Sequence, residues 1–387
     1  MPPLNLAPAT PEDYRRLAER RLPQTLFDYI DGGSGDEATL RANVQDFARL
    51  ELKQRVMRDV SNLDTRIELL GEQWSMPLAL APIGMAGMMA RRAEVQAVRA
   101  ADALGIPFCL STVAICSLEE VAKAAKRPFW FQLYMLRDRG AVGDLLQRAK
   151  AVGVKTLVFT VDLAVLGARH RDVRNGMGAG VGALARLRAG LIDYLLHPGW
   201  LRDVAIGGRP HVFGNLANYV PTAASPADFR EWVDAQFDPS ATWKDMEQLR
   251  RDWDGRLVIK GVLSPEDALA AVGAGADAVI VSNHGGRQLD GASSSINMLP
   301  RVADALKGRA SVLMDGGVRG GHDIARALAC GANAVLMGRP WIWTVAARGG
   351  DGLVSLLKAM RADLRTAMAL AGVTSAAEIN AELVERR

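Results

Sequence analysis

The stretch that decides the fold is residues 278–290, AVIVSNHGGRQLD. Its first four residues form a continuous apolar β-type run, and the chain then presents His284 and Arg287 in a glycine-containing turn. Strands buried on both faces of a helix-covered parallel sheet have runs of this kind. A proton acceptor beside a guanidinium at a strand end suits an enzyme acting on a small carboxylate, although an isolated histidine in such a turn is usually structural.

Seven further apolar runs, each ending in small or polar residues, resemble this one, and helical patterns such as residues 139–151 separate most neighbours. Apolar runs that alternate with amphipathic helices predict a parallel α/β sheet. Eight units predict a closed (β/α)8 TIM barrel, with a doubly wound open sheet as the alternative. The predicted strands occupy residues 77–84, 107–112, 128–134, 156–162, 257–262, 278–284, 311–317 and 334–340.

Two segments fall outside the eight-unit repeat. Residues 1–60 contain no predicted barrel strand, and we expect them to form an N-terminal helical cap. The connection between the fourth and fifth strands is far longer than a plain loop, so residues 163–256 are interpreted as an insertion. Residues 1–387 are nevertheless expected to form a single catalytic domain, because barrels of this class commonly carry such additions.

Residues 176–215 are the segment that we expect to contact a membrane. Residues 163–215 contain seven arginines, no lysine and three aspartates, and this excess of four equals the net charge of the whole chain. An apolar helical face flanked by Arg186 and Arg188 suits a helix in the headgroup region of an anionic bilayer, and the alternatives are an active-site lid or a subunit-contact helix. The face consists of Leu184, Leu187, Leu191, Leu195 and Leu196.

The composition narrows the classes of protein. The content of 49% hydrophobic and 23% charged residues is that of an ordinary globular chain. No apolar window is long enough for a spanning helix, and the first residues lack the pattern of a secretory signal. The three cysteines, Cys109, Cys116 and Cys330, show no CxxC spacing and predict reduced thiols rather than a disulfide or a metal site. We expect no nucleic-acid partner.

Polar side chains or glycine turns lie at the ends of seven of the eight predicted strands, which places a candidate active site at the carboxyl ends of the barrel strands. The last two strands run into DGGVRGG (residues 315–321) and GRP (residues 338–340). Backbone amides of glycine turns plus arginines at this place form a phosphate site, which implies a phosphate-bearing cofactor. The strand-end residues are Ser111, Thr112, Gln132, Tyr134, Thr160, Asp162, Lys260, Ser282, His284, Arg287, Asp315, Gly316, Gly317, Gly338 and Arg339.

These motifs resemble the FMN-dependent 2-hydroxy acid dehydrogenase and oxidase family over nearly the whole chain. The resemblance is carried by SNHGGRQLD, FQLY (131–134), TVD (160–162), KG (260–261), DGGVRGG and GRP, of which the first is highly specific. Longer stretches are most similar to the bacterial respiratory L-lactate dehydrogenases of that family. These stretches are residues 27–41, 111–122, 126–140, 167–172 and 235–245.

The resemblance implies roles for individual residues. His284 would be the catalytic base, held by Asp162, while Tyr134 would assist and bind substrate. The remaining substrate-binding residues would be Tyr29, Arg169 and Arg287. The implied FMN-binding residues are Ser111, Gln132, Thr160, Lys260, Ser282, Asp315, Gly317, Arg319, Gly338 and Arg339. No metal is implied.

The family also implies a reaction and partners. A small L-2-hydroxy acid, L-lactate, would be oxidised to its 2-oxo acid, pyruvate, with electrons passed to a respiratory quinone. The resemblance further implies a homotetramer associated peripherally with the cytoplasmic side of the bacterial inner membrane. The alternatives are a dehydrogenase for mandelate or longer 2-hydroxy acids, a soluble oxygen-using oxidase, a flavin-free isomerase or aldolase barrel, and a non-catalytic membrane scaffold.

Two departures from the family pattern weigh against an oxidase. Residues 82–84 read Pro-Ile-Gly, where many oxidases have Pro-Thr-Ala, and Val113 stands where some soluble oxidases have tryptophan. The first change alters packing and hydrogen bonding beside the expected flavin, and Val113 makes that wall of the pocket smaller and less polar.

Overall fold

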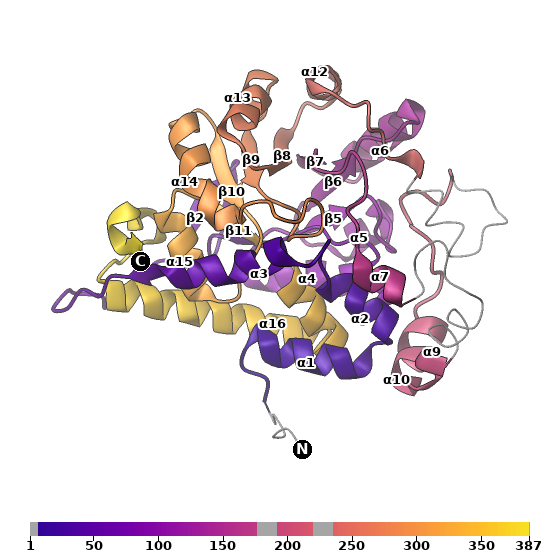
Figure 1. Cartoon of the computed structure of the whole chain (residues 1–387), viewed down its shortest axis with the longest axis horizontal. Helices are drawn as coiled ribbons and strands as arrows, with labels where there is room; N and C mark the ends of the chain where they lie inside the picture. The colour runs from indigo at the N-terminus through magenta and orange to yellow at the C-terminus, as the bar shows by residue number, and fades with distance from the viewer. Residues whose placement is uncertain (1–6, 176–191, 220–234, 387) are drawn as a thin grey trace.

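The core of the molecule is a parallel sheet of eight strands wrapped into a barrel (Figure 1). The computed structural model describes residues 7–175, 192–219 and 235–386. A parallel bridge between Leu80 and Phe108 joins the two edge strands and closes the ring. The structure therefore confirms the predicted TIM barrel and not the alternative, a doubly wound open sheet. Its strands are β4 (Leu78–Leu80), β5 (Cys109–Ser111), β6 (Trp130–Tyr134), β7 (Thr156–Thr160), β8 (Arg256–Val262), β9 (Ala278–Val281), β10 (Ser311–Met314) and β11 (Ala334–Met337).

Alternate residues of these strands face two separate cores. Leu157 and Phe159 face the outer helices, whereas Val158 packs inside the barrel with Trp130. A hairpin of β2 (Ile67–Leu69) and β3 (Glu72–Trp74) adds Trp74 to the inner core, with its ring 5.5 Å from that of Trp130. The barrel interior is thus filled with side chains, and polar residues are left for the opposite, carboxyl-terminal strand ends.

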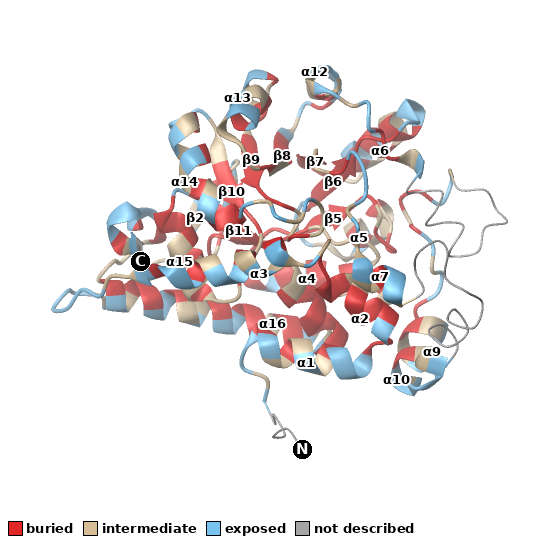
Figure 2. Ribbon diagram, viewed as in Figure 1, coloured by how far each residue is buried: buried red, intermediate tan, exposed pale blue. Residues whose placement is uncertain are grey.

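Helices surround the sheet with their apolar faces inward, as the alternation of buried and exposed stripes in Figure 2 shows. Their starts follow local capping chemistry, because the hydroxyls of Ser117 and Ser264 accept the third backbone N–H of their helices. The outer helices are α4 (Ala93–Leu104), α5 (Leu118–Ala124), α6 (Arg139–Ala151), α12 (Trp243–Asp252), α13 (Pro265–Gly273), α14 (Ser295–Leu306), α15 (Gly321–Ala329) and α16 (Arg339–Ala371), the last kinked at Gly349.

The N-terminal block consists of short helices at the side of the barrel. The first helix packs along α16, and the second packs against α7 and carries Tyr29 to the candidate site (Figure 1). The block also contains a strand, β1, which pairs antiparallel with the C-terminal β12 outside the barrel. The elements are α1 (Pro11–Arg21), α2 (Gln24–Asp31), α3 (Ala38–Gln45), β1 (Leu50–Leu52) and β12 (Val384–Arg386).

The long connection between β7 and β8 contains several short helices before the regular outer helix α12. Residues 176–191 of the predicted membrane segment, including Leu184, Arg186, Leu187, Arg188 and Leu191, lie outside the described residues. In the described remainder, Leu195 and Leu196 are 60% and 73% exposed. The short elements are α7 (His170–Arg174), α9 (Asp193–Leu195), α10 (Pro198–Trp200) and η4 (Leu201–Ile206).

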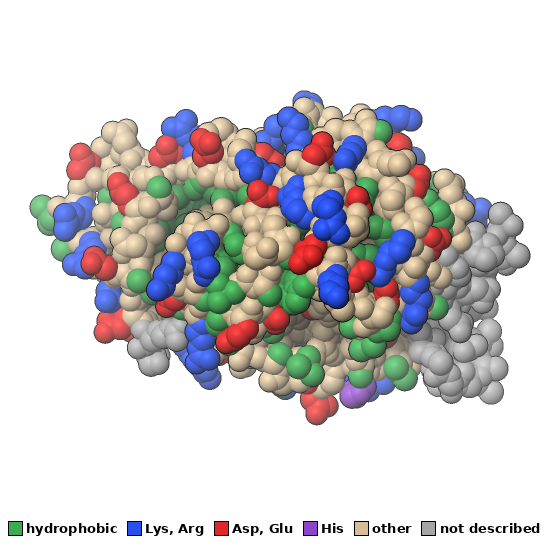
Figure 3. Space-filling view, turned by 90° about the horizontal axis from the view of Figure 1, so that it is seen from above, with side chains coloured by type: hydrophobic (Ala, Val, Ile, Leu, Met, Phe, Trp, Pro, Cys, Tyr) green, Lys and Arg blue, Asp and Glu red, His purple; other side chains and the backbone are tan. Residues whose placement is uncertain are grey.

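Two further findings concern the surface and the thiols. Within the described ranges, no helix is long and apolar enough to span a bilayer. On the face seen from above in Figure 3, acidic and basic side chains are interspersed, with hydrophobic side chains between them. All three cysteines are buried and free, which confirms the prediction of reduced thiols.

Candidate active site

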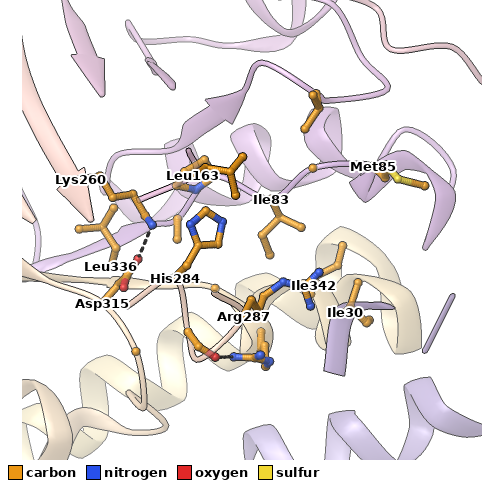
Figure 4. A pocket seen from close by; sticks show the side chains of 18 of the residues that line it. Ile30, Ile83, Met85, Leu163, Lys260, His284, Arg287, Asp315, Leu336 and Ile342 are labelled. Atoms are coloured by element: carbon orange, nitrogen blue, oxygen red, sulfur yellow. Dashed lines mark hydrogen bonds and ion pairs between the residues drawn. The ribbon is translucent and has the colours of Figure 1, made fainter. Parts of the chain in front are cut away.

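A cleft at the carboxyl ends of the barrel strands collects most of the predicted site residues. It holds about 1250 Å³ of empty space, including its open mouth. Figure 4 shows His284, Arg287 and Lys260 around this cleft, with Ile83 on its apolar side. The predicted residues that line it are Tyr29, Tyr134, Arg169, Lys260, His284, Arg287, Asp315, Gly317, Arg319, Gly338 and Arg339.

The other predicted residues lie directly behind this lining. Asp162 contacts His284, and Ser282 contacts Lys260. Ser111 donates to Gln132 Oε1 at 3.1 Å, and Thr160 is the neighbour of Lys260 in the sheet register. The structure therefore brings the whole predicted set to one end of the barrel, in two layers.

His284 lines the cleft, and Asp162 supports it from behind. The Nδ1 atom of His284 lies 2.9 Å from Oδ1 of Asp162, which leaves Nε2 as the acceptor atom of a neutral imidazole. His284 adopts the left-handed backbone conformation with φ 57°, and its own N–H donates to the Ser282 hydroxyl at 3.0 Å. Such a conformation costs energy and is common at functional sites.

Burial and neighbouring charges set the protonation states of this pair. Burial lowers the pKa of His284, and the cations Lys260 and Arg169 lower it further, while Asp162 partly opposes them. Burial alone would raise the pKa of Asp162, but the charges of His284 and Lys260 outweigh it and lower that pKa. Near neutral pH the site therefore holds a neutral imidazole beside a carboxylate, which is the arrangement of a general base and its orienting partner.

Lys260 provides a fixed cation at the bottom of the cleft. Its Nζ lies 3.3 Å from Oδ2 of Asp315 and donates to the Ser282 hydroxyl at 3.1 Å. Burial alone would lower the pKa of Lys260, but Asp315 and Asp162 outweigh it and raise the pKa. The ammonium therefore stays charged even though its side chain is only 5% exposed.

The opposite side of the cleft carries phenols and guanidiniums. Arg287 stacks over the ring of Tyr29 at 4.9 Å and donates to the carbonyl of Gly32 at 3.0 Å. Burial raises the pKa of Tyr134, and Asp162 and Tyr29 raise it further, so its hydroxyl keeps its proton. With Arg169 in the same lining, these side chains suit a planar carboxylate next to a hydroxyl.

Two half-buried arginines, Arg319 and Arg339, line the cleft together with the glycine turn of residues 315–317. Burial lowers the pKa of Arg319 to about 10, and burial with the charges of Arg287 and Arg319 lowers that of Arg339 to about 9. Both guanidiniums still carry their charge at neutral pH. The guanidinium of Arg319 lies over Trp343, and that of Arg339 donates to the carbonyls of Gly32 and Gly285, both at 2.8 Å. A bound dianion would stabilise this pair of cations.

Several polar atoms at the cleft fit a flavin nucleotide. Nε2 of Gln132, Oγ1 of Thr160 and Oδ1 of Asp315 are buried and have no hydrogen-bond partner among the described residues. Buried polar groups are normally paired, so these three atoms indicate a polar ligand. They lie on the residues predicted to bond the ring and the ribityl chain. Gly316 and Gly317 have φ of 93° and 92°, a backbone conformation that glycine adopts readily and that other residues rarely do.

Two aromatic side chains that line the cleft are not among the residues predicted from the sequence. Phe213 and Phe237 line it from within the long connection, and the ring of Phe237 lies 5.0 Å from that of Tyr134. Residue 237 falls in one of the family-like stretches, but nothing in the local pattern indicates that its side chain reaches the cleft. Val113 closes another wall, where a Cβ on Gly84 would lie 2.7 Å from its Cγ2. The smaller wall expected from residues 82–84 and Val113 is therefore also tightly packed.

Comparison with known proteins agrees with this geometry. Residues 18–386 match the model of the FMN-dependent dehydrogenase family. An L-lactate dehydrogenase of Ectopseudomonas mendocina (strain ymp) is 52% identical, covering 96% of this chain and 97% of that protein. Another of that name, from Alcaligenes faecalis, is 51% identical and covers 97% and 98%. The crystal structure of the monotopic membrane protein (S)-mandelate dehydrogenase has a TM-score of 0.91 at 35% identity, covering 98% of this chain and all of that one.

Proposed function

The chain belongs to the family of FMN-dependent dehydrogenases and is therefore an FMN-dependent oxidoreductase for 2-hydroxy acids, and from this premise we propose that it oxidises L-lactate to pyruvate. The observation that carries the proposal is the His284–Asp162 pair facing Arg287, Arg169 and Tyr134 in one cleft. The names of the relatives at 51–52% identity support lactate as the acid.

In this proposal the arginines and tyrosines hold the substrate. Arg287 and Arg169 bind the carboxylate, because a guanidinium fork matches its two oxygens. The hydroxyls of Tyr29 and Tyr134 donate to the carboxylate or hydroxyl of the substrate. Since all four side chains line the same cleft as His284, an acid that they hold has its α-carbon within reach of the base.

His284 performs the proton chemistry. Its Nε2 accepts a proton from the substrate, and Asp162 stabilises the imidazolium that forms. FMN, when bound, supplies the two-electron acceptor. Ser111, Gln132, Thr160 and Ser282 would hold its ring, with Lys260 offsetting the charge at the ring edge. Asp315 and Gly317 would bind the ribityl chain, and Arg319, Gly338 and Arg339 the phosphate.

Substrate preference is tested by anaerobic mixing of the yellow holoenzyme with L-lactate, L-mandelate or glycolate. We expect L-lactate to bleach the flavin absorbance fastest. Faster bleaching by L-mandelate would favour the second candidate, a mandelate dehydrogenase, which the structural likeness to (S)-mandelate dehydrogenase and the aromatic walls Phe213 and Phe237 support. A colourless protein that binds no FMN would contradict both.

The electron acceptor is proposed to be a membrane quinone rather than oxygen. The compact wall of Ile83, Gly84 and Val113 supports this choice. Turnover with L-lactate should be much faster with a quinone analogue than with dissolved oxygen in an oxygen-electrode assay. Rapid hydrogen peroxide formation without quinone would instead indicate an oxidase.

Peripheral attachment to the cytoplasmic side of the inner membrane is part of the proposal. Exposed apolar side chains in the described part of the connection support it, namely Ile192, Leu195, Leu196 and Ile206. Replacing Leu195 and Leu196 by aspartate should reduce co-sedimentation with anionic vesicles and leave flavin reduction intact. Undiminished vesicle binding would contradict this role.

We also propose a homotetramer of the single catalytic domain, which a mass measurement in solution tests.

A further inference from the structure

Gln288 belongs to the motif SNHGGRQLD but does not line the cleft. Its side-chain amide instead makes three hydrogen bonds to one neighbouring loop. Nε2 donates to the carbonyls of Asp162 and Val165, both at 2.8 Å, and Oε1 accepts from the N–H of Gly167 at 3.2 Å. One side chain thus ties down both ends of the loop of residues 162–167.

The loop also lies directly against the backbone that carries Gln288. A Cβ on Gly167 would lie 2.4 Å from the carbonyl oxygen of Arg287 and 2.7 Å from that of Gln288, so the approach requires glycine. Beyond it, the carbonyl of Ala168 accepts the N–H of Gly35 at 2.8 Å. The segments that carry His284, Arg169 and the N-terminal block therefore meet at this point.

Apolar packing contributes little to holding the middle of this loop. Val165 and Leu166 are 69% and 37% exposed, so hydrogen bonds supply much of the restraint. The loop nevertheless begins with the carboxylate that orients His284 and ends two residues before Arg169. A displacement of about 1 Å in such groups can cost about 100-fold in rate.

We propose that Gln288 is a positioning residue for the reaction, which fixes the loop of residues 162–167 so that Asp162 aligns His284 and Arg169 meets the substrate. This inference rests on the proposed function and extends it to a residue outside the cleft. Gln288 acts through backbone groups of the loop and touches neither substrate nor cofactor.

The test is a double-mutant cycle with Gln288→Met and Asp162→Asn, measured as the rate of flavin reduction at saturating substrate, where weaker carboxylate binding by a displaced Arg169 does not enter the comparison. Methionine preserves side-chain length and removes all three hydrogen bonds. We expect Gln288→Met alone to slow reduction about 10- to 100-fold. In the Asp162→Asn background the same change should cost less than about threefold, because the positioned group is already lost. Equal losses in both backgrounds would overturn the proposal.

Hydrogen exchange gives a readout that does not depend on activity or on bound flavin. The amide of Gly167, which donates to Gln288, should exchange faster in Gln288→Met, whereas amides of the barrel strands should be unchanged. An unchanged exchange rate of the Gly167 amide would contradict the proposal that Gln288 fixes the loop of residues 162–167. If Gln288→Met loses flavin, Gln288→Glu replaces it in the cycle, because its second oxygen would face the carbonyls of Asp162 and Val165.

Gln96 offers a matched control. It makes a similar two-sided contact far from the cleft, with Nε2 donating to the carbonyl of Arg91 at 2.6 Å and Oε1 accepting from Gly350 at 2.7 Å. Gln96→Met should keep the wild-type rate. If L-lactate does not reduce the flavin of the wild-type protein, the proposed substrate is refuted. The cycle is then measured with the 2-hydroxy acid that does reduce the flavin. If L-lactate reduces the flavin of the wild type and of Gln288→Met at the same rate, only the positioning role of Gln288 is refuted.

Discussion

The two walls of the cleft are built differently. The barrel wall carries Lys260, Asp315 and His284, each of which lies in a strand of the closed sheet or within three residues of its end. The loop wall carries Tyr29 and Arg169, which come from the N-terminal block and the long connection. Strand register holds the first wall, and side-chain clamps to loop backbone hold the second. Changes in the barrel wall, or in the Gln288 clamp that holds Asp162, should therefore slow the chemistry, whereas changes that loosen only Tyr29 and Arg169 should mainly weaken substrate binding.

The largest expected effect is the loss of the base. His284→Asn should reduce the rate of flavin reduction by about 10²- to 10⁴-fold, the usual contribution of general-base catalysis. Asparagine is the informative replacement because it tolerates the left-handed conformation of residue 284, where alanine would add strain.

The flavin content of His284→Asn is the necessary control, because the imidazole is not proposed to hold the cofactor. We expect the purified variant to remain yellow and to melt close to the wild type. A variant that is fully loaded with flavin and turns over at the wild-type rate would refute the assignment of the base to the barrel wall.

Acidification tests the same wall without a substitution. The pKa of His284 lies below its usual 6.5 because of burial, with Lys260 and Arg169 adding to the effect. The neutral base therefore persists below pH 6.5, and the rate should fall only under the lowered pKa, by about tenfold per pH unit. Between the folded pKa and 6.5 the unfolded chain binds more protons, so stability also declines as the pH falls. A reduction rate with its midpoint above pH 6.5 would contradict the buried environment.

The barrel wall is the part of the molecule that the sequence predicts well. All eight strands were identified from apolar runs such as Ala278–Val281, because a strand covered on both faces must be continuously apolar. Parallel strands bring their carboxyl ends to one edge, so Lys260, His284 and Asp315 are expected to meet there whatever the loops do. The resemblance to a known family added the assignment of individual roles.

The loop wall depends on contacts that local sequence patterns do not encode. Phe213 and Phe237 line the cleft from the long connection between β7 and β8. This connection has no repeating sequence pattern that would predict which of its side chains reach the cleft. The β1–β12 pair joins segments more than 300 residues apart, from Leu50 to Arg386, and neither segment has a strong strand pattern. Gln288 lay in a recognised motif, but its partners are backbone groups, which carry no sequence signal.

The smallest expected effect comes from a clamp behind the loop wall. Arg171 in α7 lies 2.9 Å from Asp31 Oδ2 and 2.6 Å from Glu37 Oε2, and so ties the helix that follows Arg169 to the block that carries Tyr29. Arg171→Met should raise the dissociation constant for L-lactate about three- to tenfold, or about 1 kcal/mol. The rate at saturating substrate should change less, because His284 and Asp162 lie outside the clamp.

The neighbours of Arg171 keep other hydrogen-bond partners in Arg171→Met, and Arg148 provides a matched control. Asp31 keeps its contacts with Arg15 at 2.6 and 2.8 Å, and Asp28, which loses its 3.5 Å contact with Arg171, keeps the side-chain amides of Gln24 and Asn175 as donors. Arg148 is a matched half-buried arginine, 2.8 Å from Glu119 and distant from the cleft, and Arg148→Met should leave the dissociation constant unchanged. If Arg171→Met lowered the saturated rate as strongly as His284→Asn, the two walls would not be separable. The substrate side would then belong to the same rigid unit as the base.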